Sequence, residues 1–108
     1  MEEKVVRLGL VSGNHTAPMS VDGFVLEEVP AANHMPAIHK AVQKSLEEKL
    51  GKHTNAKLEL VVDGTEFSAV MTMCLVLEVV VFCTKNGVRL TIHQRDIETG
   101  RYISYALL

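Results

Sequence analysis

Residues 69–83 read AVMTMCLVLEVVVFC, an almost uninterrupted apolar run in the C-terminal half of the chain. Thr72 and Glu78 are its only polar members. Turn-forming residues follow at 85–88 and again at 98–101, which is typical of a β-meander. A sheet with one solvated face alternates apolar and polar residues, and this run does not. We therefore expect a strand from about Met71 onward, with both of its faces covered, and a bulge, a bend or a short helical turn near Ser68–Met73.

The two turns set a register for this meander. If Asn86-Gly87 is a two-residue turn, Glu78 pairs with Arg95 across the strands. One face then turns toward the core and carries Leu75, Leu77, Val79, Val81 and Cys83. The apolar members of the opposite face are Val76, Val80 and Phe82. Because large exposed apolar patches are rare on monomers, we expect these three residues to form an interface, unless the N-terminal strands or a loop cover them.

The residues before the run predict one amphipathic helix over about 36–50. Pro36 suits the first turn of a helix, and Gly51 suits the position just after its end. Between them, apolar residues recur every four positions on one face. These are Ile38, Val42, Leu46 and Leu50.

Three further segments have strand character, namely Lys4–Val11, Val21–Val29 and Ala56–Val62. Asp63-Gly64 predicts a tight hairpin turn after the third. The expected fold class is α+β: an antiparallel sheet of about five or six strands that ends in a C-terminal β-meander and packs against the 36–50 helix. A chain of 108 residues fits a single domain, 1–108.

Composition narrows the classes of partner and compartment. The net charge is −2, and the eleven basic residues are scattered, so we expect no nucleic-acid partner. The apolar run is shorter than the ~20 residues that span a bilayer, and the N-terminus lacks a secretory leader, so we expect no membrane insertion and a cytoplasmic location. Cys74 and Cys83 are then expected to be buried thiols.

The best polar constellation combines His93 with Glu78, Arg95 and Tyr102 on one face of the meander. A histidine and a carboxylate together can perform acid–base chemistry if burial raises the pKa of the carboxyl group. The structural alternative is a polar cluster that fixes strand register, with Arg95 neutralising Glu78.

The histidines also allow the interpretation that the protein binds a metal ion. His15, His34 and His39, with Met19 and Met35 nearby, could supply a soft site. No cysteine or carboxylate stands at ligand spacing beside them, and we expect no cofactor.

No motif in the chain specifies a reaction. Our leading hypothesis is a small non-catalytic binding or assembly module, accessory or structural, that self-associates through its C-terminal meander or binds another protein. The first alternative is a small enzyme or ligand-binding protein whose ligand is unknown and whose site surrounds His93. The second is a soft-metal binder.

Overall fold

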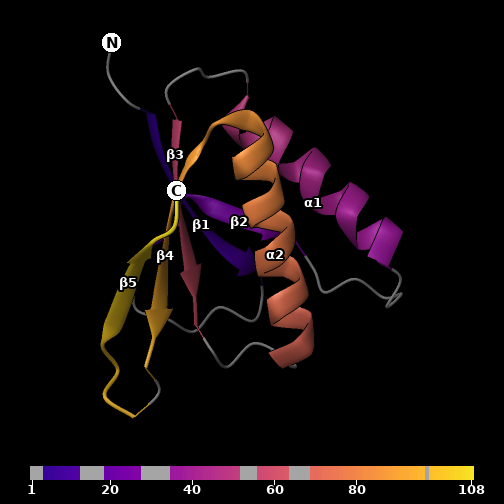
Figure 1. Ribbon diagram of the computed structural model, residues 1–108. Coiled ribbons are helices and arrows are strands. Elements are labelled where there is room, and N and C mark those ends of the chain that lie inside the picture. The colour runs from indigo at the N-terminus through magenta and orange to yellow at the C-terminus, as the bar shows by residue number, and fades with distance from the viewer. Residues whose placement is uncertain (1–3, 13–18, 28–34, 52–55, 64–68, 97) are drawn as a thin grey trace.

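The computed structural model of the chain describes residues 4–12, 19–27, 35–51, 56–63, 69–96 and 98–108. Its elements, in chain order, are β1 (Lys4–Val11), β2 (Gly23–Leu26), α1 (Met35–Leu50), β3 (Ala56–Val62), α2 (Ala69–Asn86), β4 (Arg89–Arg95) and β5 (Tyr102–Ala106). The strands form one sheet in the order β2-β1-β3-β4-β5. Both helices lie on the same side of this sheet (Figure 1). The fold is therefore α+β, as expected, and the described residues form two helices where the sequence predicted one.

The sheet is mixed, which corrects the expected antiparallel arrangement. β1 pairs in parallel with β2 and β3, β3 pairs in parallel with β4, and only β5 is antiparallel. The connections β2-α1-β3 and β3-α2-β4 are both crossovers that step toward β5. Because such crossovers are right-handed, two steps in the same direction place both helices on one face.

The apolar run forms α2, not the first strand of a meander. An almost wholly apolar run shows neither the two-residue period of a strand nor the 3.6-residue period of a helix. The element has eighteen residues, which is too long for an ordinary strand and fits a helix. The Glu78–Arg95 strand pair that we expected is consequently wrong. The predicted turn is wrong as well, because Asn86 is the last residue of α2 and Gly87 (φ 67°) ends the helix. The N–H of Val88 donates to the carbonyl of Cys83 at 2.9 Å, as in a Schellman cap.

Several local predictions are confirmed. The helix predicted over 36–50 is α1, and its four periodic residues, Ile38, Val42, Leu46 and Leu50, are its buried ones. Gly51 (φ 63°) ends α1 with its N–H bonded to the carbonyl of Glu47 at 2.9 Å. β1 and β3 have the predicted bounds, and the hairpin near residue 100 joins β4 to β5, with Gly100 at φ 73°.

Two other expectations fail or are only partly met. The strand predicted over 21–29 is shorter, because β2 covers Gly23–Leu26 among the described residues. A hairpin at Asp63-Gly64 is wrong, since α2 follows β3 and the next strand returns in parallel. Gly64 itself lies outside the described residues.

The two faces of the sheet have different chemistry. Even-numbered residues of β1, β3 and β4 face the helices, and all of them except Lys4 and Gln94 are buried: Val6, Leu8, Leu10, Ala56, Leu58, Leu60, Val62, Leu90 and Ile92. From α2, Leu75, Val79, Phe82 and Cys83 complete this core. Odd-numbered residues point to the face away from the helices, which we call the open face. Arg7, Glu59 and His93 lie there.

Two alanine substitutions distinguish the helix from the expected strand, because the strand would bury Leu77 and the helix buries Phe82. Phe82 is 3% exposed and Leu77 is 56% exposed. Phe82→Ala should lower the free energy of unfolding by about 3–5 kcal/mol. Leu77→Ala should lower it by less than about 1 kcal/mol. Urea unfolding at low protein concentration measures both, and the opposite order of effects would contradict the position of α2.

Candidate functional site

A continuous row of polar side chains crosses four strands on the open face. We call Arg7 of β1, Glu59 of β3, His93 of β4 and Ser104 of β5 the polar row. Arg7 donates to Glu59 Oε1 from Nη2 at 3.1 Å and from Nε at 3.3 Å. His93 Nε2 lies 2.8 Å from the same carboxylate oxygen, and His93 Nδ1 lies 2.7 Å from Ser104 Oγ. The row therefore links a serine hydroxyl to a guanidinium through an imidazole and a carboxylate.

The hydrogen bonds in this row assign the protons. An ionised Glu59 carboxylate can only accept, so His93 Nε2 carries the hydrogen that joins them. In a neutral imidazole the other nitrogen is then an acceptor, and the Ser104 hydroxyl donates to Nδ1. This tautomer leaves His93 placed to take the hydroxyl proton of Ser104. Side-chain exposures of 14% for His93 and 15% for Glu59 limit competition from water.

The pKa of Glu59 is lowered from its ordinary value of 4.5. Burial acts to raise the pKa of the carboxyl group, but the hydrogen bonds from His93 and Arg7 and the charge of Arg7 outweigh it. Glu59 is therefore held as a carboxylate beside the imidazole.

The structure brings together three of the four residues of the predicted polar constellation. His93, Arg95 and Tyr102 lie on the open face, and Arg95 pairs with Tyr102 across β4 and β5. Glu78 is elsewhere, on α2, because its segment is helical. Its Oε2 contacts His39 Nδ1 of α1 at 2.5 Å, and its carbonyl accepts from Gln43 at 3.3 Å. Glu78 thus joins the two helices.

Arg95 and Tyr102 have other partners at the carboxyl end of the sheet. Arg95 Nη1 lies 3.1 Å from Oδ1 of Asp63, a residue that is fully buried at the end of β3. The Tyr102 hydroxyl accepts a hydrogen bond from the N–H of Met19 at 3.4 Å. The segment before β2 therefore reaches β5, and these two contacts border the polar row on one side.

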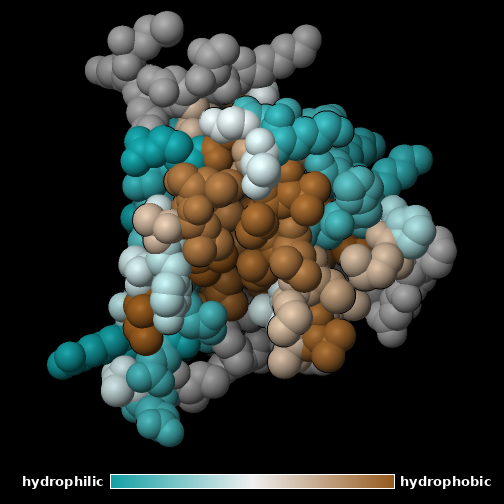
Figure 2. Space-filling view, viewed as in Figure 1, coloured by the Kyte–Doolittle hydropathy of each residue, from teal (hydrophilic) through white to brown (hydrophobic). Residues whose placement is uncertain are grey.

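A second surface lies on the helix side of the sheet and is apolar. Eight exposed residues of α2, β5 and the C-terminal end form what we call the α2–β5 patch: Val70, Met73, Leu77, Val81, Ile103, Tyr105, Leu107 and Leu108. In Figure 2 hydrophobic residues gather in the centre of this face, over α2 and beside the C-terminal end of the chain. The members on α2 recur every three or four residues, so they form one stripe of the helix.

The three residues predicted for an interface all lie on α2. Val76 and Val80 are partly buried and pack against the core, on the flank opposite Glu78. Phe82 is a core residue. The residues fully presented to solvent are instead those on the outer stripe of α2, such as Leu77.

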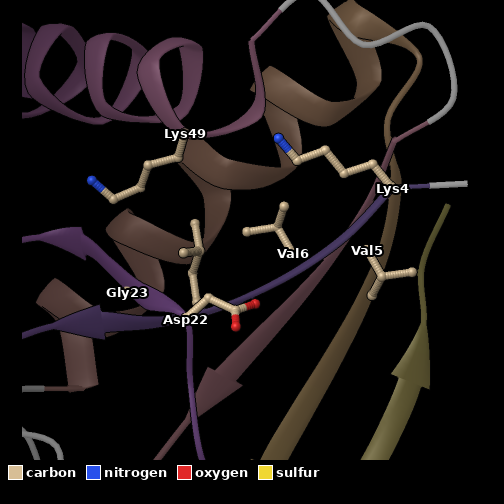
Figure 3. Close-up of a pocket in the computed structure, with 7 residues that line it drawn as sticks. Lys4, Val5, Val6, Asp22, Gly23 and Lys49 are labelled. Atoms are coloured by element: carbon tan, nitrogen blue, oxygen red, sulfur yellow. The ribbon is translucent and has the colours of Figure 1, made fainter.

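A depression of about 420 Å³ lies between β1, the start of β2 and the end of α1. Lys4 and Lys49 flank it, with Val6 between them and the Asp22 carboxylate on its lower side (Figure 3). Asp22 Oδ2 also accepts from the N–H of Arg7 at 2.9 Å. The lining is half apolar and carries charges of both signs, so it selects no class of ligand.

Of the three histidines predicted as metal ligands, the structure describes only His39. His15 and His34 lie outside the described residues. His39 is on α1 and contacts Glu78. The described ranges contain no group of three or more histidine, cysteine or acidic side chains that could hold a metal ion.

By length and composition alone, α2 could cross a membrane, and 22% of its residues are buried. In this fold, however, its two ends join β3 and β4, which are paired neighbours in the sheet. One side of α2, with Leu75 and Val79, packs against that sheet. A core helix of a folded domain can have the same length and the same apolar composition.

Sequence reasoning missed Glu59 and Ser104 as partners of His93, and Arg7 as a partner of Glu59. The alternation of Lys57 and Glu59 with apolar residues does indicate a polar face on β3. The parallel pairing of β3 with β4 sets that face beside His93, and no local pattern predicted it. Comparison of the chain with protein-family models, curated proteins and solved structures finds no match.

Glu59→Gln tests the electrostatics of the polar row. Because the folded-state pKa of Glu59 lies below 4.5, its interactions stabilise the fold above pH 4.5, and this contribution is lost as the pH falls through the lowered pKa. We expect the variant to be less stable than the wild type at pH 7 and the difference to shrink toward pH 3. Urea unfolding between these pH values measures it. Glu48→Gln, on the exposed side of α1, is the control, and a constant difference for Glu59→Gln would contradict the expectation.

Proposed function

We propose that this protein is an assembly module that self-associates through the α2–β5 patch. The observation that carries the proposal is the exposed apolar stripe of α2, where Val70, Met73 and Leu77 are 73%, 63% and 56% exposed. Self-association through the C-terminal region was our expectation from the sequence, and α2 takes the place of the expected strand as the element that makes the contact.

The area of the patch supports a second copy as its occupant. With about 200 Å² for a large apolar side chain and about half of each one exposed, its eight residues present on the order of 800 Å², close to what each partner contributes to an interface of standard size. The largest apolar patch of a typical monomer is only about 300–600 Å². Covering the patch would therefore remove an unusually large apolar surface from water.

The charges around the patch support the same occupant. None of its eight side chains is charged. The only carboxylate of α2, Glu78, points to α1 and contacts His39, so a second copy would bury no unpaired charge against the stripe. Helices that bind membrane surfaces carry several Lys or Arg residues on the polar face, whereas α2 has only Lys85, near its end. A twofold axis beside Leu77 would pack each stripe against its own copy.

A cytoplasmic location is part of this proposal, and the state of the two cysteines supports it. Cys74 and Cys83 are both free. Burial raises the pKa of Cys83 to about 11, so this thiol stays protonated and acts as a small apolar core residue.

Leu77→Lys should disrupt self-association, because a twofold contact would bring two new charges together in an apolar interface. We expect sedimentation equilibrium to show a concentration-dependent oligomer for the wild type. The association constant of the variant should be at least ~100-fold lower. Val5→Lys is the matched control, since Val5 is 48% exposed but lies on β1, away from the patch. Its oligomer should match that of the wild type.

Two results would overturn the proposal. One is a wild-type chain that stays monomeric up to about 100 μM, well above the micromolar range of weak specific complexes. The other is a monomer that co-sediments with phosphatidylcholine or phosphatidylserine vesicles and loses this binding in Leu77→Lys, which would assign the patch to a lipid surface.

A further inference from the structure

We infer that Ser104 is a nucleophile, activated by His93 and Glu59, that can attack small acyl esters at the outer edge of the sheet. This inference does not depend on self-association. Side chains of β5 alternate, so Ser104 lies on the open face, whereas Ile103 and Tyr105 of the α2–β5 patch lie on the helix side.

The first support is the order of the groups in the polar row. Nucleophilic catalysis by serine needs a base within hydrogen-bond reach of the hydroxyl and a third group that orients the base. His93 Nδ1 lies 2.7 Å from Ser104 Oγ, and its Nε2 lies 2.8 Å from Glu59 Oε1. Arg7 binds the same carboxylate oxygen and helps to keep it ionised. The Glu59 carboxylate therefore lies next to the imidazole ring on which positive charge forms once His93 has taken the proton.

The second support is the position of Ser104 on an edge strand. The N–H of Leu107 donates to the carbonyl of Leu90, and the N–H of Asp96 donates to the carbonyl of Arg101. In an antiparallel pair these bonds alternate, so odd-numbered residues of β5 bond to β4 and the N–H of Ser104 points outward. No other described strand lies beyond β5.

This outward N–H supplies a group that the side chains of the polar row lack. A tetrahedral intermediate on Ser104 Oγ carries a negative oxygen, which backbone N–H donors stabilise. The N–H of the nucleophile itself is one of the two donors in the well-known serine protease arrangement. Here the N–H of Ser104 points away from β4 at the same exposed residue that carries the activated hydroxyl, so a small substrate can approach both.

The chemical step balances with water as the only co-reactant. Ser104 Oγ forms a bond to the acyl carbon while its proton passes to His93 Nδ1. The bond from that carbon to the alcohol oxygen then breaks, and the alcohol leaves with the proton from His93. Water attacks the acylated Ser104 with His93 as base, and the carboxylic acid and the free serine are regenerated.

Labelling with diisopropyl fluorophosphate tests whether Ser104 is nucleophilic. In this reaction the serine oxygen bonds to phosphorus and displaces fluoride. Intact mass and peptide mapping of the wild-type protein should show one adduct, on Ser104. Ser20, which is also exposed but has no described histidine partner, serves as the internal control in the same folded molecule and should stay unmodified. Ser104→Ala should abolish the adduct.

His93→Gln should slow formation of the adduct at least ~100-fold, as loss of a general base does. Circular dichroism should show the same fold as in the wild type. Absence of an adduct on Ser104, equal labelling of Ser20, or an unchanged rate in folded His93→Gln would each overturn the inference. If His93→Gln does not fold, the comparison of Ser104 with Ser20 in the wild type still decides the question.

Discussion

The packing of α2 against the sheet is the constraint from which the rest of the structure follows. Leu75, Val79 and Phe82 of α2 lie in the core with the leucines of β3 and β4. β3 and β4 are parallel neighbours, and α2 is the crossover that returns the chain from the end of β3 to the start of β4. This single crossover sets Glu59 beside His93 on the open face. It also leaves the outer stripe of α2 in solvent.

The two faces of the sheet separate two kinds of surface. The helix side carries the apolar α2–β5 patch, which has no charge and favours contact with another apolar surface. The open face carries the polar row, in which the hydrogen bonds of Glu59 outweigh the cost of burying its charge. Alternation along β5 lets one short strand serve both surfaces, since Tyr105 and Ser104 are adjacent in sequence but point to opposite faces.

The sequence predicted only the part of the candidate site that lies on two strands joined by a hairpin. His93, Arg95 and Tyr102 share a face because one hairpin joins β4 to β5, and turn residues near Gly100 predict that hairpin. Arg7 and Glu59 come from strands that are remote in sequence and parallel to β4, so no turn indicates their register. Glu78 was grouped with His93 through a strand that does not exist. Its true partner, His39, depends on how α1 packs against α2.

Local sequence alone determined α1, β1, β3 and the terminal hairpin, because periodic apolar residues and turn-forming glycines act over a few positions. Gly51 ends α1 for this reason. The tertiary structure decided the conformation of residues 69–86. Residues 69–83 are apolar except for Thr72 and Glu78, so their periodicity indicates neither a strand nor a helix. The length of the run favours a helix, and the leucines of β3 and β4 provide the surface that this helix covers.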